Sequence, residues 1–332
     1  MFLELAYLLF VMTIAAAIVW KACNYLEDAC HELALYYGLP DSVKGSTVMA
    51  ISSSFPELVT IILAAGIHGD FELGLATIIG SAVFNILVIP GMSVLFRKGP
   101  LKAGRDLIYR EAQFYLISVL IIMLTLSLAL IYNPLPNTPM SATLSTSMMF
   151  LPLLFYVLYI YIQYQEVSDH KTDKKNRDIP LLKSWAKLLI SMMLVTISVE
   201  VLIQMVIKLG EMFDTPSYFW GATILAAATS IPDLFVSVKA AKRKVNAASL
   251  TNAFGSNVFD LLVVLPVGVL VTGTVVFSFP NVLPMLVFLL GATVFFLVVA
   301  RNGSKLTNNN GKILLLAYCA FIIWMGFDNL VI

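Results

Sequence analysis

Long apolar runs alternate with short polar segments along nearly the whole chain. A helix that crosses a bilayer needs about 20 mostly apolar residues. Residues 22–40 mix apolar and charged positions, so we expect them to form an amphipathic segment at the membrane surface. The pattern predicts an all-α integral membrane protein with ten transmembrane helices. The predicted spans are residues 2–20, 43–67, 71–96, 109–132, 145–164, 185–209, 216–240, 246–272, 279–300 and 311–331.

Basic residues are distributed very unequally between the predicted loops. With the N-terminus outside, the outer loops carry only Lys208 of the 21 Lys and Arg residues. The remainder fall in inner loops, as the positive-inside rule requires when both termini lie outside. The most polar stretch, residues 165–184, predicts a short cytoplasmic linker. It divides the chain into two five-helix halves, residues 1–164 and 185–332.

Composition agrees with a membrane protein and excludes several functional classes. Of the 332 residues, 59% are hydrophobic and only 12% are charged, whereas a soluble domain has about 25% charged residues. A net charge of +1 gives no reason to expect a nucleic-acid partner. The three cysteines, Cys23, Cys30 and Cys319, lack metal-ligand spacing and are interpreted as small apolar residues. The first apolar run has no basic segment before it, which favours a retained helix over a signal peptide.

The two halves contain a matching pair of segments, at about 43–96 and 216–272. The block SSFPE at residues 53–57 matches TSIPD at 229–233, and GSAVFN at 80–85 matches GSNVFD at 255–260. Two matched blocks in the same order and at nearly the same spacing are hard to obtain by chance. Because each half has five spans, the second half enters the membrane from the opposite side. The sequence therefore predicts inverted repeats with a binding site near the midplane between them.

The first helix of each matched pair combines a proline with a carboxylate. Pro56 and Pro232 lack an N–H group and clash with the carbonyl four residues earlier, so we expect broken helices with freed carbonyls. In a membrane such carbonyls need another partner, and a dehydrated cation is one. Glu57 and Asp233 follow the prolines, well inside apolar runs, where an ionised carboxylate costs about 3 kcal/mol. These carboxylates must be paired or used for function.

Further oxygen donors stand at helical spacing from these carboxylates. Ser53 and Thr229 come four residues before them, on the same helical face. In the second helix of each pair, Gly80 and Gly255 are expected to allow close backbone approach. The polar pairs that follow these glycines are Ser81 with Asn85 and Ser256 with Asp260. A donor set made of oxygen alone suits Ca²⁺, Na⁺ or K⁺ and argues against zinc or copper.

The two blocks resemble the alpha-1 and alpha-2 repeats of the cation/calcium exchanger superfamily, which includes the sodium/calcium exchangers. The resemblance implies that Glu57 and Asp233 ligate calcium and sodium at the centre of the site, with Asn85 and Asp260 completing it. It also implies flanking sodium ligands, namely the hydroxyls of Ser53, Thr229, Ser81 and Ser256 and the carbonyls near Ala50 and Ala226. The combination of Glu57 with Asp233 and the sequence motifs SAVFN and SNVFD look most like those of the potassium-dependent branch.

The resemblance implies a secondary antiporter that exchanges Ca²⁺ for Na⁺ by alternating access. The transported ions are then the ligands, and neither an enzymatic activity nor a resident cofactor is expected. In this mechanism the first and sixth spans slide past the site. The predicted location is the cell membrane, with the lipid bilayer as the surrounding partner.

Four alternatives stay open at this point. A calcium/proton antiporter and a potassium-dependent sodium/calcium exchanger would share the fold. An intramembrane aspartyl protease could use two membrane aspartates to activate water, but the Gly-x-Gly-Asp setting expected for it is absent. A passive cation channel would conduct without a counter-ion.

Overall fold

The protein is a bundle of long helices in the computed structural model, which describes residues 2–38, 48–97, 101–102, 105–166, 179–243, 246–300 and 305–331. The first half contains α1 (Phe2–Tyr37), α3 (Met49–Ser53), α4 (Phe55–Gly66), α5 (Phe71–Leu95), β1 (Leu101–Lys102), α6 (Arg105–Tyr132), β2 (Ser141–Leu144), a 3₁₀ turn (Thr146–Met149) and α7 (Phe150–Glu166). The second half contains α8 (Leu181–Phe213), α9 (Ser217–Trp220), a π-helical turn (Gly221–Leu225), α10 (Ala226–Lys242), α11 (Asn246–Phe259), a second π-helical turn (Asp260–Val264), α12 (Leu265–Thr272), β3 (Val275–Ser278), α13 (Phe279–Ala300), β4 (Lys305–Leu306) and α14 (Asn308–Val331).

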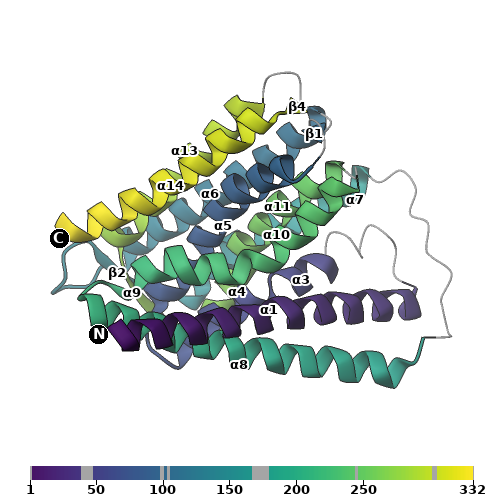
Figure 1. Ribbon diagram of the computed structural model, residues 1–332. Helices are drawn as coiled ribbons and strands as arrows, with labels where there is room; N and C mark the ends of the chain where they lie inside the picture. The colour runs from purple at the N-terminus through teal and green to yellow at the C-terminus, as the bar shows by residue number, and fades with distance from the viewer. Residues whose placement is uncertain are drawn as a thin grey trace.

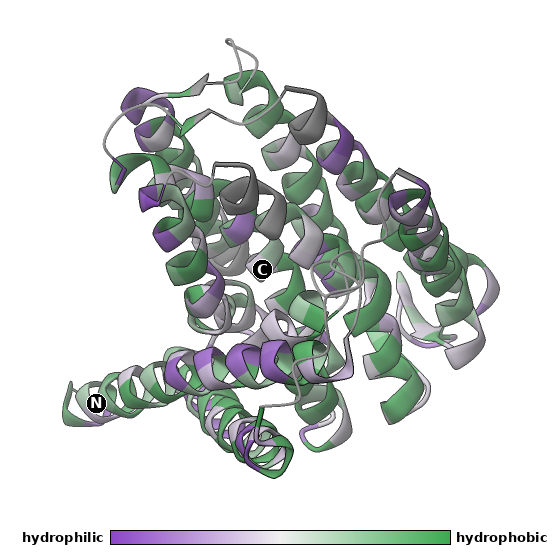
Figure 2. Cartoon of the chain, turned by 90° about the vertical axis from the view of Figure 1, so that its right-hand side faces the viewer, coloured by the Kyte–Doolittle hydropathy of each residue, from purple (hydrophilic) through white to green (hydrophobic). Residues whose placement is uncertain are grey.

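The helices are long and apolar enough for the predicted membrane spans. Within the described ranges, nine helices qualify by length and composition, and α3 with the shorter α4 supplies the tenth crossing. Hydrophobic residues predominate along the flanks of the bundle (Figure 2). Large apolar side chains such as Leu158, Val298 and Leu316 are exposed there. Such a surface would promote aggregation of a soluble protein, whereas in a bilayer it faces lipid. The chain is thus a multi-pass integral membrane protein, as predicted.

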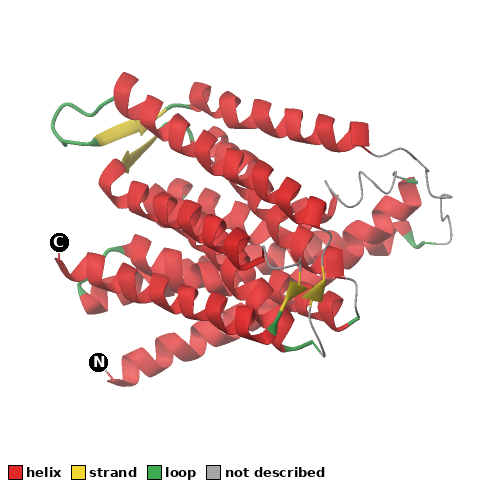
Figure 3. Cartoon of the chain, turned by 90° about the horizontal axis from the view of Figure 1, so that it is seen from above, coloured by secondary structure: helices red, strands yellow, loops and turns green. Residues whose placement is uncertain are grey.

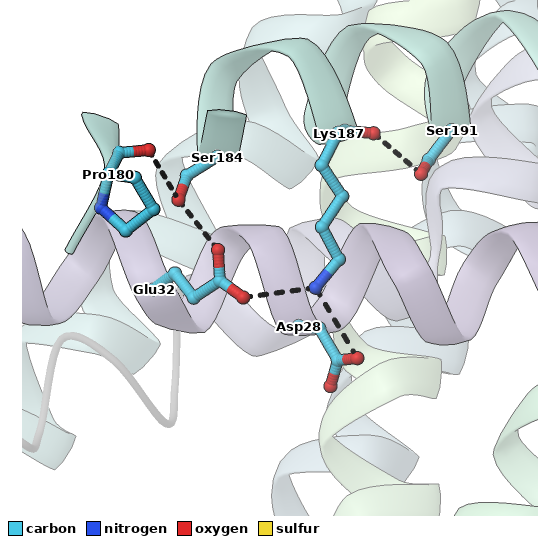
Figure 4. A network of polar contacts seen from close by, with 6 residues as sticks. All are labelled: Asp28, Glu32, Pro180, Ser184, Lys187 and Ser191. Carbon is cyan, nitrogen blue, oxygen red and sulfur yellow. Dashed lines mark hydrogen bonds and ion pairs between the residues drawn. The ribbon is translucent and has the colours of Figure 1, made fainter. Parts of the chain in front are cut away.

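The prediction of a separate surface segment at residues 22–40 is wrong over residues 22–38; residues 39 and 40 lie outside the described part of the chain. Helix α1 continues without interruption to Tyr37 and packs along α8 for much of its length (Figure 1). The charged positions are used between these two helices, where Lys187 on α8 lies 3.0 Å from Glu32 and 3.5 Å from Asp28 on α1 (Figure 4). Ser184 also donates a 2.6 Å hydrogen bond to Glu32. Sequence pattern alone could not find the partner helix that accommodates these charges.

Both chain ends lie at the same end of the bundle, as an even number of spans requires (Figure 1). Two small antiparallel sheets lie at opposite ends of the helices (Figure 3). At the end with the termini, Ser141–Leu144 pairs with Val275–Ser278, and at the other end Leu101 and Lys102 pair with Leu306 and Lys305. Each sheet joins one strand from each half of the chain. The halves are therefore tied together on both sides of the membrane.

The interior is formed chiefly by α5, which packs against α10, α4, α13 and α14. Helix α4 packs in turn against α12. In the predicted repeat, α4 corresponds to α10 and α5 to α11 with α12, so the α5–α10 and α4–α12 contacts are equivalent. This exchange of partners between halves is the arrangement expected of interlocked inverted repeats.

Candidate cation site

The first repeat has a helix break beside its proline. Helix α3 ends at Ser53 and α4 begins at Phe55, with Ser54 between them in a non-helical conformation. Pro56 occupies the first turn of α4, where its missing N–H costs nothing. Glu57 therefore lies in the first turn of α4, at the positive end of the helix dipole. The break predicted for this helix is confirmed.

In the second repeat Asp233 also follows a proline, but the predicted helix break at Pro232 is wrong. Helix α10 runs through Pro232 from Ala226 to Lys242. The irregular backbone lies instead in two π-helical turns, Gly221–Leu225 before α10 and Asp260–Val264 after α11. The second of these begins at Asp260 itself. Single π-helical turns of this kind are frequent at functional sites.

All the predicted polar side chains are buried at the interface between the two repeats. Glu57, Asp233 and Asp260 are only 2%, 3% and 1% exposed, and Asn85 is fully buried. The hydroxyl-bearing residues Ser53, Thr229, Ser81 and Ser256 are buried as well. The three carboxylates thus lie in the interior of the bundle, away from its lipid-facing surface.

Four serines connect the repeats through two equivalent contacts. Ser81 lies 2.7 Å from Ser230, and Ser256 lies 3.2 Å from Ser54. Each contact joins the second helix of one repeat to the first helix of the other. The same serines bind their own repeat's carboxylate, because Ser81 donates to Glu57 and Ser256 donates to Asp233, both at 3.2 Å. This paired pattern is the local signature of the pseudo-twofold relation between the repeats.

An amide chain fixes the orientation of Asn85. The Asn257 side chain donates to the carbonyl oxygen of Ala82 at 3.1 Å, and that acceptor requires the amide nitrogen to face it. The Asn257 oxygen therefore faces Asn85, whose amide nitrogen donates to it at 3.0 Å. The remaining oxygen of Asn85 has no hydrogen-bond partner among the described residues. One carboxylate oxygen of Glu57 and one of Asp260 also have no hydrogen-bond partner among the described residues.

The carbonyls predicted as flanking ligands already accept local hydrogen bonds. Ser53 donates to the carbonyl of Ala50 at 3.3 Å, and Thr229 donates to the carbonyl of Ala226 at 3.2 Å. The Ala50 carbonyl also accepts from the backbone N–H of Ser54 at 3.0 Å. The two hydroxyl–carbonyl pairs again match each other between the repeats. A cation at these positions would have to replace the hydroxyl proton as the carbonyl's partner.

The two repeat glycines differ in their surroundings. A Cβ atom added to Gly80 would lie 2.1 Å from the carbonyl oxygen of Ala222, so only glycine fits where α5 crosses the first π-helical turn. Gly255 has open space around it, because among the described residues no atom outside its own stretch of helix lies within 4 Å of an added Cβ. The expected close backbone approach is thus found at Gly80, and the same expectation at Gly255 is wrong.

Sequence reasoning missed three buried residues of this region: Ser54, Ser230 and Asn257. The two serines occupy matched positions in the repeat, and this was the signal that could have revealed them. Asn257 has Ala82 at its matched position, so repeat symmetry gives no indication of its role. In the described part of the chain, no three His, Cys, Asp or Glu side chains are grouped to hold one metal ion. Any cation bound here would also need hydroxyl, amide or carbonyl oxygens.

Comparison with known proteins identifies the family. The model of the sodium/calcium exchanger protein family matches residues 6–165 and 183–327. The chain belongs to this family. The inner membrane protein YrbG of Escherichia coli is 23% identical over 325 residues, covering 95% of this chain and 94% of that protein. The sodium/potassium/calcium exchanger Nckx30C of Drosophila melanogaster is 42% identical over 86 residues, which is 26% of this chain and 10% of that protein.

Two solved exchanger structures share the fold of this chain. The H⁺/Ca²⁺ exchanger CAX superimposes with a TM-score of 0.73 at 12% identity, covering 97% of this chain and 84% of that one. The sodium-calcium exchanger NCX_Mj, soaked with 100 mM Na⁺ and 10 mM Sr²⁺, gives a TM-score of 0.62 at 22% identity and covers 95% and 97% of the two chains. The predicted ten-helix exchanger architecture is confirmed.

Proposed function

We propose that the chain is an antiporter that exchanges Ca²⁺ for Na⁺ across the cell membrane, with Glu57, Asp233, Asp260 and Asn85 as the central ligands. The observation that carries this proposal is the doubled arrangement of buried oxygens at the repeat interface. Each carboxylate of the first helices accepts a hydrogen bond from a serine that also contacts the opposite repeat. The oxygen-only composition suits hard cations.

Charge balance supplies the coupling. Three ionised carboxylates in a low-dielectric interior are strongly destabilising when no cation is bound. One Ca²⁺ ion with a protonated carboxylate, or about two or three Na⁺ ions, would bring the site close to neutrality. A nearly neutral site crosses between the two access states more easily than an empty one. The same carboxylates thus make the two ions competitors for one site.

The moving part in this proposal is the pair α1 and α8. These two helices pack mainly along each other at one side of the bundle (Figure 1), whereas the two small sheets tie together loops next to α5, α6, α12, α13 and α14. Sliding of the pair would open the site alternately to the two sides of the membrane.

Proton and potassium coupling are the alternatives with specific support. Of the two solved structures above, the one named as an H⁺/Ca²⁺ exchanger gives the higher TM-score. The similarity to a sodium/potassium/calcium exchanger over 86 residues favours potassium coupling. Both alternatives use the same carboxylates, so they differ in the driving ion and not in the site.

Transport in reconstituted vesicles separates these possibilities. Calcium uptake is measured with an outward sodium gradient, with a pH gradient alone, and with sodium in the presence or absence of potassium. We expect uptake with the sodium gradient and none with the pH gradient alone. Uptake driven by the pH gradient would contradict sodium coupling, and calcium flux without any counter-ion would indicate a channel.

The variants Glu57→Gln and Asp233→Asn test the assigned ligands in the same assay. Both should abolish exchange, because each removes a buried charge from the site. Glu211→Gln is the matched control, since Glu211 is an exposed carboxylate on α8. Substantial transport in either site variant would refute the central role assigned to these carboxylates.

A further inference from the structure

Ser237 lies on the inner side of the cation site, on the same face of α10 as Asp233. It follows Asp233 by four residues and Ser230 by seven, so the three residues form one row along the helix. Ser230 contacts Ser81 of α5, which places this row on the side of α10 that packs against α5. Helix α10 runs toward the basic, cytoplasmic end of the bundle, and its rise from Asp233 to Ser237 is about 6 Å. Ser237 is therefore the next polar side chain of this row on the way to the cytoplasm.

The hydroxyl of Ser237 is fully buried and has no hydrogen-bond partner among the described residues. A buried hydroxyl within a helix commonly donates to the carbonyl four residues earlier. In this bundle the following side chains do so: Thr60, Thr77, Ser118, Thr125, Ser191 and Thr293. Ser237 does not make the equivalent bond to the carbonyl of Asp233. Because burial of a hydroxyl without a partner is unfavourable, this serine requires an explanation other than packing.

Ser237 shares this condition with the proposed ligands. One oxygen each of Glu57, Asn85 and Asp260 is likewise enclosed and without a hydrogen-bond partner among the described residues. In the part of the chain that the structure describes, Ser237 has the only carboxylate, amide or aliphatic hydroxyl oxygen in this state outside the four central positions. Enclosed oxygens that lack a partner are thus confined to the central site and to one position directly inward of it.

The matched position in the first repeat is apolar. It is Ile61, four residues after Glu57 and on the outer side of the site, because α4 runs outward. Ile61 is fully buried and packs closely against two glycines, since an added Cβ would lie 3.0 Å from its Cα at Gly74 and 2.5 Å from its Cγ2 at Gly268. The repeat fold therefore does not require a serine at this position. Ser237 makes the inner side of the site chemically different from the outer side.

Helix α5 has a second oxygen at nearly the same depth. Pro90 lies within α5 and has no N–H group, so the carbonyl of Ile86 loses its usual helical donor. From the contact between Ser81 and Ser230, α5 rises about 8 Å to Ile86 and α10 rises about 10 Å to Ser237. In a membrane a freed carbonyl needs another partner, and a dehydrated cation is one. Neutral oxygen donors of this kind suit hard cations such as Ca²⁺ and Na⁺.

We propose that Ser237 is a further cation ligand, which holds the transported Ca²⁺ or Na⁺ as it passes between Asp233 and the cytoplasm. This inference rests on the exchange function proposed above and adds one position to the path of the ions. The hydroxyl oxygen replaces part of the ion's hydration shell one helical turn inward of the central site. The outer side has no such oxygen at Ile61, so the loss of the hydroxyl should weaken binding from the cytoplasmic side alone.

Calcium uptake measured from each side of the membrane tests this inference. Everted and right-side-out vesicles are prepared from cells that express the full-length protein. The calcium concentration for half-maximal uptake is measured in both, with whichever gradient, sodium or proton, drives uptake. Ser237→Ala should raise this concentration about fivefold in everted vesicles, equivalent to about 1 kcal/mol. It should leave the value for right-side-out vesicles unchanged, whereas a purely structural role would change both.

Two further variants serve as controls. Ser237→Thr keeps the hydroxyl and should keep the wild-type value on both sides. Ser118→Ala removes a buried hydroxyl that donates to the carbonyl of Phe114 in its own helix at 2.8 Å, and it should change neither value. An equal shift on both sides, no shift on either side, or the same loss in Ser237→Thr would overturn the inference. If the wild-type protein shows no uptake driven by either gradient, the proposed exchange function is refuted, and this inference falls with it.

Discussion

Among single residues, Asn257 determines what Asn85 presents to a cation. The Ala82 carbonyl accepts only from a donor, so the direction of the whole amide chain is set by one backbone atom. The Asn85 oxygen is left facing away from Asn257 and ready to act as a ligand. An amide that could rotate freely would present a repulsive N–H group to the ion half of the time.

Asn257→Ala should therefore weaken calcium binding without removing any proposed ligand. It leaves the buried amide N–H of Asn85 without its acceptor, a loss of about 1–3 kcal/mol in the stability of the protein. We expect the calcium concentration for half-maximal exchange to rise. Vesicle uptake over a calcium titration measures this, with Asn133→Ala in an outer segment as control. An unchanged half-saturation value would show that Asn85 is oriented by other contacts.

The carboxylate of Asp260 has only an amide as its counterpart in the other repeat. Asp260→Asn removes one negative charge from the site and makes the two positions alike. Because Coulomb energy is proportional to the ion's charge, the affinity for Ca²⁺ should fall more than the affinity for Na⁺. Competition between the two ions in the uptake assay measures the ratio. Equal loss for both ions would argue against Asp260 as a shared ligand.

At the scale of helices, the crossing of α5 and the first π-helical turn depends on one missing side chain. Gly80→Ala would place a methyl group 2.1 Å from the Ala222 carbonyl and force the helices apart. Overpacking of this kind costs about 1–3 kcal/mol or more. We expect a lower thermal unfolding temperature in detergent together with loss of transport.

The matched variant Gly255→Ala provides the comparison within the same repeat motif. Its added methyl group meets no described atom of another helix within 4 Å, so the unfolding temperature should stay close to that of the wild type. Equal destabilisation by both substitutions would contradict the close-crossing explanation, since helix propensity by itself favours alanine over glycine at both positions. Differential scanning fluorimetry of the two purified variants is sufficient to decide.

The contact between α1 and α8 includes polar groups that contribute little to stability. Lys187, Glu32 and Asp28 are partly exposed, with side-chain exposures of 27%, 38% and 68%. Ion pairs in such positions contribute about 0–1 kcal/mol to folding. Lys187→Met should therefore shift the unfolding temperature only slightly, as should the control Lys183→Met. A large shift confined to Lys187→Met would identify this network as a main anchor of α1.

At the scale of the whole molecule, the distribution of basic residues assigns the two faces of the bundle. In a cysteine-free background, Thr138→Cys and Lys183→Cys place single thiols at exposed positions on opposite sides. A membrane-impermeant maleimide added to intact cells should label Thr138→Cys but not Lys183→Cys. The reverse pattern would invert the orientation that the positive-inside rule assigns.

The span count, the two halves and the principal oxygen donors follow from the sequence. Apolar runs must match the thickness of the bilayer, and a buried carboxylate within such a run is too costly to be incidental. The repeat motifs also predict Glu57, Asn85, Asp233 and Asp260 as cation ligands without knowledge of any contact. These features are local or periodic, so pattern is sufficient to predict them.

Only the tertiary structure shows how the repeats share their donors. The contacts Ser81–Ser230 and Ser54–Ser256 join residues far apart in the chain, and Asn257 acts through a backbone carbonyl of the other half. The same applies to α1, whose charged inner half looks like a surface segment until α8 provides its partners. Proline predicted a break at residue 232, yet packing kept α10 continuous and moved the irregular backbone into two π-helical turns. Sequence determines which groups must leave the water, and the packing of distant helices decides which groups they meet.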